Sequence, residues 1–335
     1  KTMSIANKKQ RNSIAILEVL RDVGETASSE EIAAALTAKG LDMSERTVRL
    51  YLQQLDEEGF TASVPKHGRR LTPQGLGELD VSTALTRVGS MSARIDRMTY
   101  RMSFDLATRS GTVVVNMSLV RPKELKARLE PFLKVFDKGY AMGTMVGLLR
   151  TGESLGDLAI PEGFVGLCSV CSITLNGVLL KHGVPTRSLF SGLLELKGGR
   201  ARRFTEIISY EGTSIDPLEM FIRAGLTDYM GAIKNGEGRI GAGFREIPAE
   251  SRVTVLALAE KLGRIGLGAF LEIGLPGQSV MNIPVREGCC GVVVIGGLNP
   301  VAVFEETGIR IASRALCGTF EFLRLFPYHE LPARL

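Results

Sequence analysis

Two cysteines at a spacing known from metal and redox chemistry are the first candidates for reactivity. Cys168 and Cys171 form a CxxC pair, which occurs in redox motifs and as half of a zinc site. The chain has no second CxxC pair, and its three histidines, at positions 67, 182 and 329, are scattered. We therefore interpret Cys168 and Cys171 as small residues of buried strands and predict no metal ligand, with a redox or metal role as the alternative.

The residue types that enzymes use for catalysis form no recognisable pattern. The scattered histidines give no support for a Ser-His-Asp triad. Neither a P-loop nor a dinucleotide-binding glycine motif is present, because the GEG string at 236–238 lacks the third glycine and the preceding strand. Nothing in the sequence pairs the carboxylates of Glu246 and Glu272. We predict no catalytic residue and no enzymatic activity.

Donors for a small anion gather where glycine-rich stretches lead into predicted helices, at residues 168–176 and 296–299. The first backbone N–H groups of a helix attract anions, and neighbouring hydroxyls add further donors. Arg245, just before a predicted long helix, supplies a cation. The predicted effector-binding residues are Cys168, Ser169, Ser172, Thr174, Asn176, Arg245 and Asn299.

Basic and amide side chains near the N-terminus indicate a second kind of binding, to DNA. Arginine and glutamine on a helix can make bidentate contacts to base edges, whereas cations on a turn contact phosphates. The predicted DNA-binding residues lie on one helix and on the basic turn that follows it: Ser44, Arg46, Thr47, Arg49, Gln53, Lys66, Arg69 and Arg70.

The elements that must carry these N-terminal residues follow from helical spacing, capping serines and glycine stops. Their order is typical of a winged helix-turn-helix, and the alternative is a helical hairpin with a solvated charged face. The predicted elements are helices over 14–23, 28–40 and 44–59, a strand over 60–64, a basic turn over 65–70 and a short helix over 72–79.

The rest of the chain repeats itself. Glycines, prolines and short strings recur at matching spacings, which predicts two copies, at 90–197 and 210–323. Each copy has the order helix, strand, helix, strand, strand, helix and strand. Coincidence among 38 glycines is the alternative. The alignment pairs Cys168 with Val293, Cys171 with Gly296, and Leu175-Asn176 with Leu298-Asn299.

The predicted fold class is therefore an N-terminal all-α/winged helix-turn-helix domain followed by an internally duplicated α+β effector domain. A cleft between the two copies is the expected place for a small ligand. The predicted divisions are a DNA-binding domain over 1–80, a linker over 81–92 with its hinge at 90–92, a first repeat over 93–200, and a second repeat with a C-terminal tail over 201–335.

Composition limits the class of protein further. With 335 residues, 44% hydrophobic and a net charge of +5, the chain is expected to be globular and to bind DNA through a local basic patch. Five cysteines, two of them adjacent, do not suit a secreted disulfide framework. The most apolar stretch, 288–304, is interrupted by Asn299-Pro300 and is too short to span a membrane. We expect a cytoplasmic protein without a membrane partner.

Three strings of the chain resemble the NrpR family of nitrogen-regulatory transcriptional repressors from methanogenic and related archaea. They are GLCSVCSITLNG at 166–177, GTSIDPLE at 212–219 and FREIP at 244–248, and the N-terminal winged helix adds to the likeness. The resemblance implies a homodimer that binds palindromic operators of nitrogen-fixation and ammonia-assimilation genes. It also implies release from double-stranded operator DNA by 2-oxoglutarate, a small dicarboxylate effector, with no further cofactor.

Two other classes of protein stay open at this point. One is a metabolite-responsive regulator of another pathway that shares this architecture. The other is a winged-helix protein with an enzymatic α+β domain, which a cluster of perturbed carboxylates in the cleft would indicate.

Overall fold

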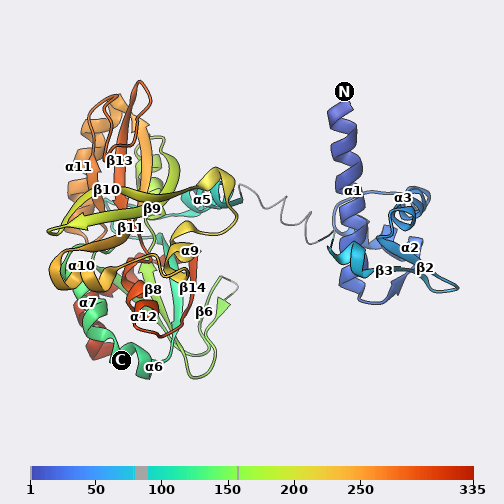
Figure 1. Cartoon of the computed structure of the whole chain (residues 1–335), viewed down its shortest axis with the longest axis horizontal. Coiled ribbons are helices and arrows are strands. Elements are labelled where there is room, and N and C mark those ends of the chain that lie inside the picture. The colour runs from blue at the N-terminus through green and yellow to red at the C-terminus, as the bar shows by residue number, and fades with distance from the viewer. Residues whose placement is uncertain (1, 78, 80–89, 157) are drawn as a thin grey trace. The chain divides into compact units, whose positions relative to one another are not determined.

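The computed structural model describes residues 2–77, 79, 90–156 and 158–335, with side-chain burial from residue 12 onward. The chain divides into two compact units, which we call the N-terminal unit (1–88) and the C-terminal unit (89–335). Figure 1 shows the two units with their element labels, and each is described by itself. Positions 81–89 of the predicted linker lie outside the described residues.

In its described residues the N-terminal unit has three helices, a short helical segment at 73–77 where the sequence predicted one over 72–79, and a small antiparallel sheet of strand order β1-β3-β2, which confirms the predicted winged helix. Ser28 and Ser44 cap the second and third helices, as predicted, by accepting bonds from Glu31 N and Thr47 N. The first helix begins earlier than the apolar spacing indicated. The elements are α1 (Thr2–Val23), β1 (Thr26–Ala27), α2 (Ser29–Ala38), α3 (Glu45–Glu57), β2 (Thr61–Val64) and β3 (Gly68–Leu71).

Apolar side chains from all three helices form the core of this unit. Leu20, Ile32 and Leu52 are each at most 1% exposed, and they lie on the inner faces that the sequence pattern indicated. Gly68 begins β3 at φ 94°, and a Cβ there would lie 2.1 Å from the Ala27 carbonyl oxygen. Only glycine therefore lets β3 approach β1 closely enough to pair with it.

The C-terminal unit contains two copies of a shared element order, as predicted, with two additional short strands in the first copy and one additional strand at the start of the second. The first copy comprises α5 (Ser90–Arg101), β4 (Thr112–Val120), α6 (Pro122–Ala127), α7 (Leu129–Asp137), β5 (Met145–Leu149), β6 (Ser154–Leu155), β7 (Leu158–Ala159), β8 (Val165–Val170), α8 (Ile173–Lys181) and β9 (Arg187–Lys197). The second comprises β10 (Arg200–Ser209), η1 (Tyr210–Gly212), α9 (Pro217–Arg223), α10 (Tyr229–Asn235), β11 (Gly238–Pro248), η2 (Ala249–Ser251), α11 (Arg252–Arg264), β12 (Phe270–Ile273), β13 (Cys289–Ile295), η3 (Asn299–Val301), α12 (Ala302–Glu306) and β14 (Ala312–Glu321). A tail of η4 (Phe322–Arg324), β15 (Phe326–Pro327), η5 (Tyr328–Glu330) and α13 (Leu331–Arg334) follows.

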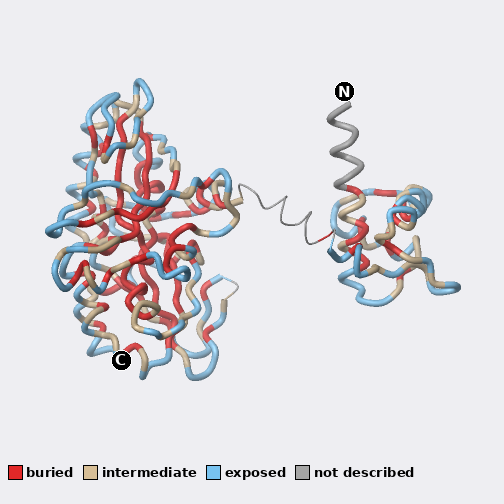
Figure 2. Tube along the Cα trace, in the orientation of Figure 1, coloured by how far each residue is buried: buried red, intermediate tan, exposed pale blue. Residues whose placement is uncertain are grey.

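The two copies exchange their last strands, which the sequence did not reveal. One sheet has the order β14-β4-β8-β5-β15, and the other has the order β10-β9-β11-β13-β12. The last strand of the second copy, β14, thus pairs with the first copy, and β9 of the first copy pairs with the second. The expected picture of two separate halves with a cleft between them is therefore corrected, because each sheet needs strands from both copies. Figure 2 shows buried residues running through the centre of this unit.

Backbone hydrogen bonds show directly which residues of the two copies occupy equivalent positions. Cys171 N donates to Val114 O, and Gly296 N donates to Gly241 O, as the sequence alignment paired them. Three residues later, the Thr174 hydroxyl and the Asn299 amide donate to those same two carbonyls, at 3.0 and 2.9 Å. Thr174, not Asn176, is therefore the counterpart of Asn299, which corrects the alignment by two positions.

The residues expected to form a hinge instead begin α5. Met91 is fully buried, and its N–H donates to Thr213 O, so 90–92 are anchored to the C-terminal unit. In the part of the chain that the structure describes, no helix combines the length and the apolar character that crossing a membrane requires.

Candidate DNA-binding surface and effector pocket

The third helix of the winged helix presents several of the predicted DNA-binding side chains to solvent. Arg46 and Gln53 are exposed on α3 and form no hydrogen bond or ion pair with the described residues. Ser44 and Thr47 lie at the start of this helix, where their side-chain oxygens are 2.9 Å apart. Arg46 and Gln53 are thus free to contact the edges of bases.

Arg49, in contrast, is held by its neighbours. It forms an ion pair with Glu45 one turn earlier, and its Nε donates to Ser29 Oγ of α2 at 3.3 Å. Ser29 also donates to Glu45 at 2.9 Å. These contacts tie α3 to α2, so Arg49 would have to leave them in order to reach a base.

The cations of the basic turn, or wing, are also of two kinds: some have no described partner, and one is held in an ion pair. Lys66 lies at the tip with φ 66°, and Lys66 and Arg70 are both exposed without a described partner. Arg69 donates to Asp56 of α3 at 3.0 Å, and Asp56 also accepts from the Thr61 hydroxyl. Arg69 therefore connects the wing to the end of α3, and Lys66 and Arg70 are the wing residues available to phosphates.

We expect the two wing arginines to give different results when replaced. Arg70→Ala should weaken binding to every DNA sequence and reduce the number of counterions released on binding by about one, because each phosphate contact releases counterions. Arg69→Ala should lower the free energy of unfolding by about 1 kcal/mol, because it leaves Asp56 without its cationic partner. Fluorescence anisotropy over a salt series and thermal unfolding measure these effects. Equal salt dependence in Arg70→Ala and the parent chain would remove Arg70 from the DNA contact.

Four of the predicted effector residues have structural roles. Cys168 and Ser169 lie inside β8, and Ser169 accepts from Asn116 at 3.4 Å. Thr174 and Asn299 tie the starts of α8 and η3 to neighbouring strands. None of these four lines the pocket described below, and of the seven predicted effector residues only Ser172 does.

The structure brings Ser172, Asn176 and Arg245 together in one buried cluster. Arg245 is 2% exposed, and its guanidinium donates to Ser172 O at 2.9 Å, to Ser172 Oγ at 2.8 Å and to Asn176 Oδ1 at 2.5 Å. Asn176 in turn donates to Ser188 Oγ at 2.9 Å. All of these partners are neutral, and burial lowers the pKa of Arg245 to about 10. A buried cation without a carboxylate partner is costly, so the cluster is a place where an anion would be stabilised.

The equivalent place in the other copy carries no charge. Arg245 pairs with Ser188 across β11 and β9, and the matching pair across β4 and β14 is Ser118 with Ser313. Those two hydroxyls lie 2.7 Å apart. The arginine is therefore a difference between the copies and not a requirement of their shared fold.

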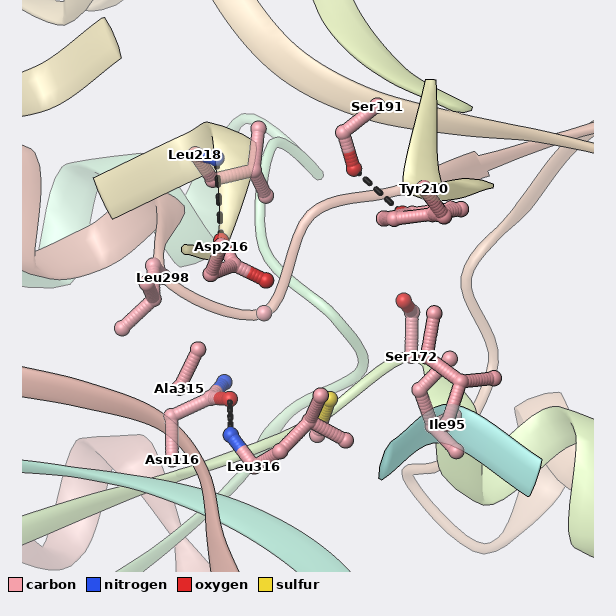
Figure 3. A pocket seen from close by; sticks show the side chains of 13 residues that line it. Ile95, Asn116, Ser172, Ser191, Tyr210, Asp216, Leu218, Leu298, Ala315 and Leu316 are labelled. Atoms are coloured by element: carbon pink, nitrogen blue, oxygen red, sulfur yellow. Dashed lines mark hydrogen bonds between the residues drawn. The ribbon is translucent and has the colours of Figure 1, made fainter. Parts of the chain in front are cut away.

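A pocket lies beside this cluster, where the two copies meet (Figure 3). Residues at the start of α8 and at the start of η3 both line it, as expected for the two glycine-rich stretches. Leu316, at φ 49° in a β-bulge of β14, gives its N–H to Asn116 Oδ1 at 3.1 Å. Polar atoms enter the pocket from several elements, on the residues Asn116, Ser172, Ser191, Tyr210 and Asp216.

Sequence reasoning missed Asn116, Ser191, Tyr210 and Asp216 as pocket residues. Ser191 and Tyr210 share a hydrogen bond of 2.5 Å, and Asp216 caps α9 by accepting from Leu218 N at 2.9 Å. The Asp-Pro step at 216–217 was a capping signal, since proline suits the first position of a helix. No local signal indicated that four segments from both copies would meet at this point.

Burial in the pocket raises the pKa values of its ionisable groups Asp216 and Tyr210. Burial and the charge of the neighbouring Glu219 raise the pKa of Asp216 to about 6, against the opposing effects of the Glu219 and Leu218 backbone N–H donors and of Arg94. Burial also raises the pKa of Tyr210. The cavity is small, with a volume of about 20 Å³, which is room for about one water molecule.

The cysteine pair is buried and free, in agreement with its interpretation as small strand residues. Cys168 lies in β8 and Cys171 directly after it, and burial raises the pKa of each thiol to about 12. Such thiols stay protonated at neutral pH and are poor nucleophiles. Across the described residues, no three or more His, Cys, Asp or Glu side chains are placed to hold a metal ion.

Comparison with known proteins agrees with both units. Residues 14–79 match the family model "Ribonuclease R winged-helix domain", and residues 88–326 match "NrpR regulatory domains NRD1 and 2". The chain is 31% identical to the global nitrogen regulator NrpRI of Methanosarcina mazei, with 93% of this chain and 96% of that protein covered. It is also 31% identical to the global nitrogen regulator NrpR of Methanocaldococcus jannaschii, with 98% of this chain and 56% of that protein covered.

A solved structure shares the fold. The crystal structure of a nitrogen repressor-like protein from Methanococcus jannaschii has a TM-score of 0.60 and 25% identity, and it covers 70% of this chain and 97% of its own. The relatives that cover most of this chain are named as regulators, so the winged helix and the α+β unit belong to a regulatory family rather than to an enzyme family. The chain belongs to the NrpR family, which confirms the resemblance found in the sequence.

Proposed function

We propose that this chain represses nitrogen-assimilation and nitrogen-fixation genes by binding palindromic operators as a homodimer, and that 2-oxoglutarate releases it from DNA. The relatives named as global nitrogen regulators support the pathway. The winged helix supports operator binding, because one recognition helix reads a half-site and two copies read a palindrome. The buried Arg245 without a carboxylate partner is the observation that carries the effector proposal.

The effector proposal follows from charge and position. A dicarboxylate carries two negative groups, and Arg245 with the Ser172 hydroxyl and the start of α8 offers donors for one of them. Ser191, Tyr210 and Asn116 offer neutral donors for the remainder of the molecule. Neutral donors suit an anion, and so does the protonated form of Asp216, whereas the ionised form of Asp216 would repel it.

Binding of this ligand requires the pocket to widen. 2-Oxoglutarate is larger than a cavity of about 20 Å³, so the surrounding side chains must move apart. Ile95 of α5 and Leu316 of β14 are part of that wall. We therefore expect α5, the first helix of the C-terminal unit, to move when the pocket widens. A ligand that binds the widened form more tightly shifts the protein toward that form.

The direct test is operator binding with and without effector. We expect a mobility shift on a palindromic operator to be reversed by 2-oxoglutarate and much less by glutamate, in which an ammonium replaces the keto oxygen. Each tenfold loss of operator affinity requires about 1.4 kcal/mol of preference for the widened form. Sedimentation of the free protein should give the mass of a dimer. Failure of 2-oxoglutarate to bind would disprove the nitrogen-sensing proposal and leave DNA binding in place.

Effector affinity should depend on pH through Asp216. A dianion beside this side chain favours its protonated form, so the affinity should fall as the pH rises above about 6, by at most tenfold per pH unit. Asp216→Asn keeps the helix cap and removes the titration. Calorimetry from pH 6 to 8.5 should show a flat affinity profile for Asp216→Asn and a sloping one for the parent chain. Parallel profiles would place the ligand away from Asp216.

A further inference from the structure

A second pocket lies between α5, the beginning of β9 and the end of β11. Its volume is about 410 Å³, within the range of small-molecule sites and far above that of the effector pocket. Charges of both signs line it, and we call it the mixed-charge pocket. Its charged side chains are Asp96, Arg187, Glu211, Glu246 and Arg286.

Two ion pairs form part of the wall, and each leaves donors unused. Arg286 holds the buried Glu246 through its backbone N–H at 3.0 Å and its Nε at 2.5 Å. Arg187 donates to Glu211 through Nη2 at 3.0 Å. The Nη1 group of each guanidinium makes no hydrogen bond to a described residue. Both arginines are about half exposed, so these donors can reach a ligand in the pocket.

Asp96 on α5 supplies the unbalanced charge. It is exposed and forms no ion pair or hydrogen bond with the described residues, although it lines the pocket. Glu246 is fully occupied by Arg286, whereas the carboxylate of Glu211 has a second oxygen without a described partner. The pocket therefore combines two sets of free guanidinium donors with one free and one half-used carboxylate.

We propose that the mixed-charge pocket binds a free α-amino acid as its zwitterion. The ammonium group pairs with Asp96 and Glu211, and the carboxylate accepts from the Nη1 groups of Arg187 and Arg286. With three carboxylates and two guanidiniums, the wall repels a dianion, so this site differs in ligand class from the effector pocket. Ser92 leaves a hydroxyl for a polar side chain of the ligand.

Calorimetry of the full chain with matched ligands tests the charge requirement. Alanine carries both charged groups, propionate lacks the ammonium and ethylamine lacks the carboxylate. We expect heat of binding from alanine and from amino acids with larger polar side chains, such as glutamine, and none from propionate or ethylamine. Equal binding of propionate would make the pocket an anion site, and no binding of any amino acid at millimolar concentration would also overturn the proposal.

Substitutions test the location. Asp96→Asn and Arg187→Gln should each weaken amino acid binding by about tenfold or more, because each removes a charge-assisted contact. Asp96→Glu, which keeps the charge, should retain binding. Arg203→Gln is the matched control, since Arg203 also holds an exposed pair, with Glu195, outside the pocket. Thermal unfolding shows that each variant is folded, and unchanged affinity in both pocket variants would exclude this site.

The outcome is independent of the proposed 2-oxoglutarate effector. If the chain binds 2-oxoglutarate but no amino acid, only the proposal for the mixed-charge pocket is disproved. If the chain binds an amino acid through Asp96 and Arg187 but does not bind 2-oxoglutarate, only the effector proposal is disproved.

Discussion

Arg245→Met should abolish the response to 2-oxoglutarate while leaving operator binding in place. Truncating one partner of a buried charge pair costs about 2–5 kcal/mol of binding, so the affinity should fall by at least about 30-fold. The substitution fills a similar volume without the charge, and it leaves Ser172 and Asn176 without their donor. Calorimetry gives the effector affinity, and a mobility shift gives the affinity for the operator.

The other copy supplies the control for this experiment. Ser118→Ala removes a hydrogen bond at the position equivalent to Arg245, between the corresponding strands β4 and β14 of the other sheet. It should lower stability slightly and leave effector affinity unchanged. If Arg245→Met binds 2-oxoglutarate as tightly as the parent chain, the anion site lies elsewhere and the buried guanidinium is only structural.

Arg46→Ala should remove sequence preference from DNA binding. A bidentate contact between arginine and a base edge contributes about 1–3 kcal/mol of discrimination, which is roughly tenfold to a hundredfold for each half-site. Arg46 is the arginine of α3 that is exposed and has no described partner. Competition between the operator and a scrambled duplex, measured at fixed salt, should show this loss directly.

Arg49→Ala is the informative comparison, since the sequence placed both arginines on the reading face. Because Arg49 is bound to Glu45 and Ser29, we expect its replacement to change sequence preference less than Arg46→Ala does. A larger effect from Arg49 would mean that it leaves these partners on DNA. In that case the surface of α3 rearranges when the operator binds.

The sequence allowed the architecture to be predicted well because local signals and the repeat agree. Capping serines at 28 and 44 and the basic turn were sufficient for the winged helix, and recurring glycines were sufficient for two copies of one element order. The strand exchange could not be predicted, because β9 is a largely apolar strand with a buried centre, and this pattern is the same whether it pairs with its own copy or with the other.

The sequence predicted only those site residues whose types, charged or polar, indicated a binding role. Arg245, Ser172 and Asn176 were selected for their types, and the structure brings them together. Thr174 and Asn299 were selected for the same reason, yet their side chains are used to hold helix starts to strands. Tyr210 and Asp216 were missed because only the tertiary fold brings them to the pocket.

The exchange of strands also has a consequence during synthesis. β4 near residue 112 pairs with β14 near residue 321, so the first sheet stays incomplete until most of the chain has emerged from the ribosome. The winged helix needs no such partner and can fold early. A chain interrupted before β14 would therefore carry a finished DNA-binding domain without the pocket wall at Leu316. Under the proposed function, such a fragment would lack part of the site through which 2-oxoglutarate releases the operator.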